Sequence, residues 1–233
     1  MNINKPRFAP RPVNAMLLLF FAIISFGVAA KDLPQTSHDG LELVKDTKLR
    51  VVYMKPGATL DQYKRVALLD CYVAFKKNWQ RDYNRDVVGL ERRITDQDME
   101  KIKNKVAKEF KKVFTTELET KGGYAIVDTT GEDVLIIRPA IINLVVNAPD
   151  KMTAGISRSF TADPGELTLY LELYDSVSNS IIARAIDPVA ARNGGFFQLT
   201  NSVTNTADAD RVIRKWADIL RDNLGDVTGN KGD

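Results

Sequence analysis

The 233-residue sequence contains one cysteine, Cys71, and one histidine, His38. A single cysteine cannot close a disulfide within the chain, and these two residues cannot build a Cys/His zinc site. His38 lies in a polar stretch whose neighbours do not indicate packing into a fold, so Ser-His-Asp and Cys-His catalysis are not expected. The sequence also lacks a glycine-rich phosphate loop. We therefore predict no metal, no cofactor and no catalytic residue, and we expect Cys71 to be buried in an apolar run.

The chain has little excess charge. Its formal net charge of +3 comes entirely from Lys5, Arg7 and Arg11, because residues 1–30 contain no acidic residue and the rest of the chain is balanced. Nucleic-acid-binding domains usually carry a basic surface. The sequence therefore predicts no nucleic-acid partner.

Residues 1–30 have the pattern of a secretory signal peptide. Three basic residues precede an apolar run from Met16 to Ala30, which ends in Val28-Ala29-Ala30. Small residues there predict cleavage after Ala30. The run is shorter than the roughly 20 residues of a membrane span, although an uncleaved anchor is the alternative. We expect a periplasmic or secreted protein without a transmembrane span after cleavage. An association with the outer membrane and the oligomeric state stay open.

The remaining chain is predicted to contain a flexible leader at 31–48, a single domain at 49–225 and a disordered tail at 226–233. Apolar patterns predict two amphipathic helices, one opened by a capping box at Thr95 and Asp98 and one starting near Asp208 or Asp210. They also predict about six strands, at 49–54, 63–75, 124–128, 134–146, 167–175 and 181–191. We expect an α+β (mixed α/β) fold, with a mainly antiparallel mixed sheet packed against the two helices.

Two residues interrupt the predicted strands. Pro139 cannot donate a ladder hydrogen bond, so it marks an edge, a bulge or a bend. Asp70 interrupts an apolar strand, so it is either paired or at the solvated end.

Residues 167–175 and 181–191 are predicted to form a hairpin in which Glu172 faces Arg184. One face of this hairpin sets leucines against small residues, which leaves room for a helix. On the other face Tyr170 and Tyr174 frame the ion pair. That face could be solvated, covered by a helix or bound by a partner.

Three sets of side chains are candidate contact residues. The first set combines aromatic and basic residues in one polar segment: Trp79, Arg81, Tyr83 and Arg85. Aromatic rings stack on sugars and arginines bind anions, so this segment could recognise a glycan, a lipid headgroup or an envelope protein. The second set is the adjacent pair Phe196 and Phe197, and the third is Tyr170 with Tyr174. The structural alternative for the first set is a loop that covers the sheet edge.

Six stretches of the chain resemble the bacterial domain-of-unknown-function family 3313. They are VYMKPGATLDQYKRV (52–66), VAFKKNWQRDYNRD (73–86), EDVLIIRPAIINLVVNAPD (132–150), LTLYLELYDSVSNSIIARAID (167–187), NGGFFQLTNSVTN (193–205) and DRVIRKWADILRDNL (210–224). The resemblance implies a small cell-envelope protein, and many members are assigned as lipoproteins. Because the family's activity is unknown, it implies no catalytic residues. Lipoproteins carry a cysteine at the cleavage point, whereas this chain has VAA-KD, so the resemblance does not extend to a lipid anchor.

We therefore predict an exported, non-enzymatic binding or assembly module of the cell envelope. The alternative is a carboxylate-dependent hydrolase acting on envelope polymers. It would require two close carboxylates in a cleft, at least one of them with a raised pKa.

Overall fold

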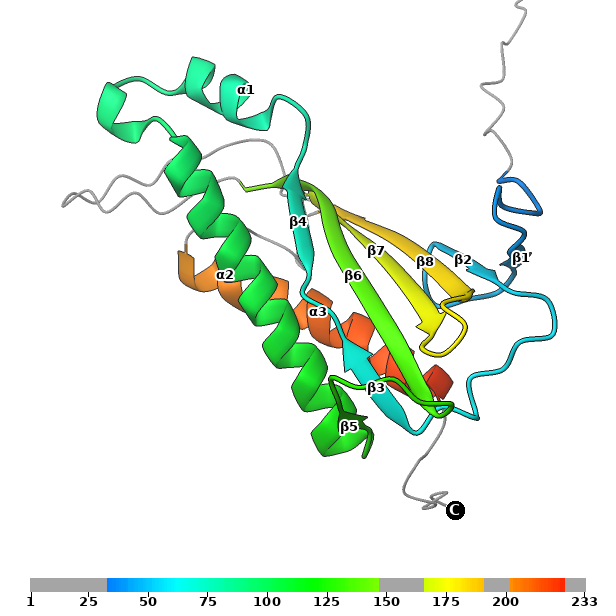
Figure 1. Ribbon diagram of the computed structural model, residues 1–233. Coiled ribbons are helices and arrows are strands. Elements are labelled where there is room, and N and C mark those ends of the chain that lie inside the picture. Colours follow the sequence, from blue (N-terminus) through cyan, green and yellow to red (C-terminus); the bar gives the residue numbers. More distant parts are fainter. Residues whose placement is uncertain (1–32, 147–165, 191–201, 225–233) are drawn as a thin grey trace, which may run out of the picture. The chain divides into compact units, whose positions relative to one another are not determined.

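The computed structural model describes residues 33–146, 166–190 and 202–224 (Figure 1). The predicted signal peptide, the predicted tail, Phe196 and Phe197 lie outside these residues. The strands are β1 (Glu42–Val44), β2 (Val51–Met54), β3 (Arg65–Leu68), β4 (Tyr72–Phe75), β5 (Ala125–Ile126), β6 (Val134–Val145), β7 (Glu166–Asp175) and β8 (Ile181–Ala190). The helices are α1 (Trp79–Asp86), α2 (Asp96–Thr115) and α3 (Ser202–Leu224), with a 3-10 turn η1 (Leu90–Arg92) and a π-helical turn η2 (Thr116–Lys121).

The described strands form one mixed sheet of eight strands. Its order is β1-β2-β8-β7-β6-β3-β5, and β4 also pairs with β6. The neighbours from β1 to β6 in this order are antiparallel, whereas β3 pairs in parallel with β5 and β6, and β4 in parallel with β6. The α+β prediction with a mixed sheet is therefore confirmed. The sheet has more strands and more parallel pairing than expected, because apolar patterns locate strands but do not specify their neighbours.

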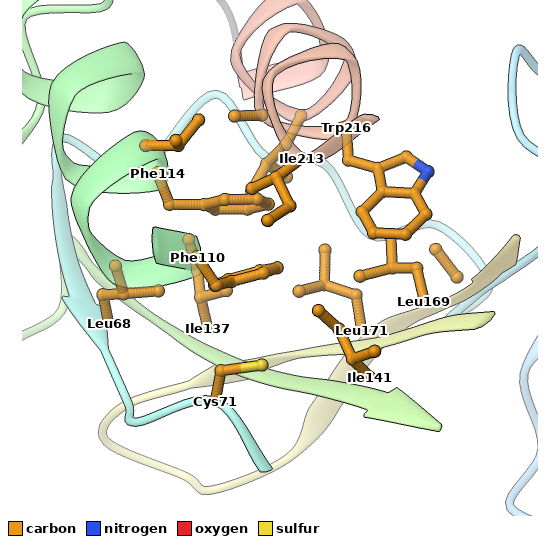
Figure 2. Packing of buried hydrophobic residues seen from close by; sticks show 14 of the residues in the cluster. Leu68, Cys71, Phe110, Phe114, Ile137, Ile141, Leu169, Leu171, Ile213 and Trp216 are labelled. Atoms are coloured by element: carbon orange, nitrogen blue, oxygen red, sulfur yellow. The ribbon is translucent and has the colours of Figure 1, made fainter. Parts of the chain in front are cut away.

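Helices α2 and α3 cover the same face of the sheet. Figure 2 shows Phe110 and Phe114 of α2 beside Ile213 and Trp216 of α3, above residues of β3, β6 and β7. The predicted gap above the hairpin is filled as expected, since Trp216 lies over Leu169. Cys71 is buried at this core, and burial raises the pKa of its thiol to about 12. Among the described residues, no helix is long and apolar enough to cross a membrane.

The predicted capping box at the start of α2 is present. The Asp98 amide donates to the Thr95 hydroxyl at 3.2 Å, and the Thr95 amide donates to the Asp98 carboxylate at 2.9 Å. Both bonds satisfy amides that the helix itself leaves without partners.

Replacing Thr95 by alanine should lower the free energy of unfolding by about 1 kcal/mol, because one of these amides loses its acceptor. Urea unfolding followed by circular dichroism measures the change. Gln97→Ala is the matched control, because Gln97 is exposed in the same helical turn. An equal loss in both variants would contradict the role of the cap.

The predicted strand at 63–75 is two strands with a break between them. Strand β3 pairs with residues 134–137 of β6, and β4 pairs with β6 from Ala140 onward. Pro139 therefore lies opposite the break, where β6 has no partner on that side and the missing N–H costs no ladder bond. Asp70 lies in the break, exposed, and accepts a hydrogen bond from the Lys111 ammonium at 2.9 Å.

Two elements lie where the sequence does not predict them. Helix α1 falls in a polar segment and begins at Trp79, and the side chain of its N-cap residue Asn78 makes no capping hydrogen bond. Strand β1 falls within the predicted flexible leader and pairs with β2. Helix α3 also begins at Ser202, earlier than its apolar stripe indicates.

A buried carboxylate joins η2 to α3. Glu117 is fully buried, and its carboxylate contacts Lys121, Arg214 and Arg221. Burial alone would raise the pKa of Glu117, but the hydrogen bonds and the nearby positive charges outweigh burial and lower it. This cluster fixes the end of the α2 segment against α3.

Candidate functional site

The face of the sheet opposite α2 and α3 carries a row of polar side chains across four strands. Strand register places Arg138 of β6 beside Glu172 of β7, then Arg184 of β8 and Tyr53 of β2. Register partners share a face. The neighbouring row contains Tyr72 of β4, followed by Ala140 and Tyr170. We call the part of this face formed by Tyr72, Arg138, Tyr170, Glu172 and Tyr174 the open face.

Glu172 is the centre of the hydrogen-bond network on this face. Its carboxylate accepts bonds from the Tyr170 hydroxyl at 3.0 Å, the Tyr174 hydroxyl at 2.8 Å and the Arg184 guanidinium at 3.0 Å. Burial would raise the pKa of Glu172, but these donors outweigh burial and hold the pKa below its ordinary value. Glu172 is therefore an ionised carboxylate whose oxygens already have partners, and it acts as an anchor for its neighbours.

The predicted cross-strand pair of Glu172 and Arg184 is confirmed. The hairpin register holds from Glu166 to Leu173 and shifts at Tyr174, which pairs with Ile181. Both members of the pair are buried, so this part of the sheet face is not solvated.

The segment that precedes β1 covers one side of the same face. The Asp39 carboxylate binds the Arg184 guanidinium with both oxygens, and the Pro34 carbonyl accepts the Tyr53 hydroxyl at 2.9 Å. Leu41 packs with Val51 of β2 in a small second core. The hydrogen bond from Arg184, followed by that from Ser37, lowers the pKa of Asp39.

Replacing Asp39 by asparagine should lower the free energy of unfolding by about 1 kcal/mol at pH 7, since a partly exposed pair loses its charge. In the unfolded state the pKa of Asp39 should be near 4. In the folded state the pKa is lower. Its contribution is therefore complete above about pH 5 and falls as the pH drops below 4. Urea titrations across this range should show the gap between the variant and wild type closing in acid. Asp61→Asn is the matched control, because Asp61 is exposed.

Two side chains of the open face are well exposed. Tyr72 is 66% exposed, and the Arg138 side chain is 64% exposed with one guanidinium nitrogen 3.7 Å from the Glu172 carboxylate. The hydroxyls of Tyr170 and Tyr174 donate hydrogen bonds to Glu172. These residues are half-buried, and it is their rings that a bound molecule could contact. The open face thus presents the rings of Tyr72, Tyr170 and Tyr174 beside the Arg138 guanidinium.

The structure separates the aromatic and basic residues of the first candidate set. Trp79 is buried, stacks on Phe75 with centroids 4.5 Å apart and contacts Tyr83 at 5.5 Å. Arg81 and Arg85 are exposed and form ion pairs with Asp82 and, for Arg85, with Asp86. The rings of Trp79 and Tyr83 therefore pack against the core, whereas Arg81 and Arg85 are exposed to solvent.

Tyr72 and Arg138 belong to the open face, but the sequence analysis does not identify them as candidate contact residues. Arg138 could have been found from the alternation of β6, because its side chain interrupts an apolar pattern on the same face as Glu172. Tyr72 could not, because its strand was predicted to be continuous with β3.

A shallow groove beside the hairpin turn bears on the hydrolase alternative. Its lining includes Glu132, Asp133 and Asp175. A hydrogen bond from Arg65 lowers the pKa of Asp133, and bonds from Ser178 lower the pKa of Asp175. These shifts favour the ionised form of both carboxyls, whereas the hydrolase requires a carboxyl with a raised pKa. Among the described residues, no cluster of three or more metal-ligating side chains occurs.

Comparisons with known proteins identify a family for this chain. No curated protein matches the chain. Among solved structures, a single-substitution variant of the PelC dodecamer from Paraburkholderia phytofirmans has a TM-score of 0.36 at 10% identity, covering 73% of this chain and 95% of PelC. A candidate lipoprotein from Caulobacter crescentus CB15 has a TM-score of 0.29 at 10% identity, covering 71% of this chain and 88% of the other. These scores are too low to support a conclusion about function. The family model DUF3313, described as a protein of unknown function, matches residues 35–220, so the chain belongs to the DUF3313 family.

Proposed function

We propose that this protein is exported, loses residues 1–30, and acts in the periplasm as a non-enzymatic module that binds another envelope protein through the open face. The signal-peptide pattern of residues 1–30 supports the export. The observation that carries the binding role is the exposure of Tyr72 and Arg138 on a sheet face that neither α2 nor α3 covers.

A protein partner fits this surface best. Tyrosine and arginine are enriched in protein interfaces and at their energetic centres. Because Glu172 fixes the tyrosine hydroxyls, the rings of Tyr170 and Tyr174 are held in place before a partner arrives. A preorganised surface loses less side-chain entropy on binding.

Export is tested by cell fractionation and mass spectrometry of the mature N-terminus. A periplasmic species that begins at Lys31 supports the proposal. An intact Met1 in the inner membrane would overturn it.

Binding is tested by photo-cross-linking in cells, with a photoreactive phenylalanine derivative placed at Tyr72. We expect an adduct with one protein, identified by mass spectrometry, that weakens when Arg138→Glu is added. Val177 is the matched control position, because it is 60% exposed on the hairpin turn. Equal adducts from both positions, or none from Tyr72, would contradict the proposal.

A further inference from the structure

The turn that follows α1 and leads into η1 carries the two most exposed of the large apolar side chains in the described part of the chain. Val88 is 87% exposed and Leu90 is 76% exposed. Gly89, between them, has a φ of 100°, a conformation that favours glycine. We call Val88-Gly89-Leu90 the tip. A single exposed apolar residue is ordinary in soluble proteins, but here two flank one turn.

The base of this turn is held by side-chain amides. Asn84 of α1 donates to the Ile94 carbonyl at 2.8 Å and accepts from the Ile94 amide at 2.7 Å. Gln80 also donates to the Ile94 carbonyl and to the Asp96 carboxylate. Since Ile94 is buried in the core, the turn projects from a fixed base while its tip remains exposed.

The tip lies within a basic segment of the chain. Residues 76–93 contain six basic residues, namely Lys76, Lys77, Arg81, Arg85, Arg92 and Arg93. They contain three acidic residues, Asp82, Asp86 and Glu91. The segment therefore has a net charge of +3, in a chain that is neutral overall beyond residue 30. An anionic surface complements this charge.

We propose that the tip inserts Val88 and Leu90 into the headgroup region of an anionic lipid bilayer, where the basic residues of the same segment contact the phosphates. Apolar side chains flanked by Lys and Arg bind membranes in this way, by burying apolar area and by electrostatic attraction. The inference is separate from the proposed function, because the tip and the open face share no residue.

Co-sedimentation with vesicles tests the inference on the chain that begins at Lys31. We expect binding to vesicles of phosphatidylethanolamine with phosphatidylglycerol, weakening as salt is added, and little binding to phosphatidylcholine. Val88→Asp and Leu90→Asp should each reduce the partition coefficient about ten-fold or more. Val177→Asp should leave it unchanged, because Val177 is exposed elsewhere. Equal binding by the tip variants and wild type, or no binding by wild type, overturns the proposal.

A fluorescent reporter tests insertion directly. Leu90→Cys gives a reactive site for a polarity-sensitive dye, because the native Cys71 is buried and its thiol pKa is about 12. The dye at position 90 should shift to the blue on anionic vesicles, whereas the same dye on Val177→Cys should not. Identical spectra at the two positions would overturn the proposal.

Discussion

Replacing Trp216 by alanine should lower the free energy of unfolding by about 4 kcal/mol, the largest loss that we expect from a single substitution. Trp216 is almost completely buried between α3 and the sheet, where it lies beside Leu169 (Figure 2). Its indole N–H donates to the Asp187 carboxylate at 2.8 Å, and Asp187 is itself buried. The alanine variant therefore combines a large cavity with a buried carboxylate that keeps only the Arg50 amide as its donor among the bonds described. Urea unfolding followed by circular dichroism measures the loss.

Trp216→Phe separates packing from hydrogen bonding. This variant keeps most of the apolar volume but removes the N–H, so it should cost about 1–3 kcal/mol, the penalty for a buried polar group that loses its donor. Lys215→Ala is the matched control, because Lys215 is exposed on the same helix. If Trp216→Ala cost less than about 1 kcal/mol, well below the usual range for such a truncation, α3 would not be packed on the sheet as described.

Local patterns in the sequence predicted those parts of the fold that depend on nearby residues. The capping box at Thr95 was predictable because both of its partners lie within one helical turn. The pairing of Glu172 with Arg184 followed from alternation across a short turn. Alternation also predicted the space that Trp216 fills, since large leucines oppose small residues there.

Features that depend on distant parts of the chain could not be predicted in the same way. Helix α1 has a polar sequence, and its position depends on Trp79 entering the core and on the Asn84 bonds to Ile94. Strand β1 is three residues long, and its position depends on β2. The break between β3 and β4 lies opposite Pro139 of β6, which is distant from both strands in the sequence.

In the candidate site, too, features that depend on nearby residues were predictable, whereas features that depend on tertiary packing were not. Tyr170 and Tyr174 were predicted from the alternation of one strand, and the structure places both around Glu172. Trp79 lies among arginines in the sequence, but its side chain is buried and is not available at the surface. Composition shows which side chains are near one another in sequence, whereas packing decides which of them are accessible.

Replacing Arg184 by methionine should lower the free energy of unfolding by about 3 kcal/mol, because it leaves Glu172 as a buried charge without its main cation. The loss should be at the low end of the range for broken buried pairs, since the hydroxyls of Tyr170 and Tyr174 still donate to Glu172. The same substitution also releases Asp39, so the segment before β1 should exchange its amide hydrogens faster. Urea unfolding and hydrogen exchange measure the two effects.

The double variant Glu172→Gln with Arg184→Met distinguishes a buried charge from lost packing. Without the Arg184 guanidinium, the pKa of Glu172 should rise above its value in the wild-type protein, because fewer donors and positive charges then oppose the effect of burial. Glu172 in this variant therefore takes up a proton at a higher pH than in the wild-type protein, so the stability deficit of Arg184→Met should shrink as the pH falls toward about 4. The double variant removes the charge and should therefore be more stable than Arg184→Met at neutral pH, with a pH-independent deficit in that range. If the double variant were no more stable, the loss would come from packing of the Arg184 side chain rather than from the charge of Glu172.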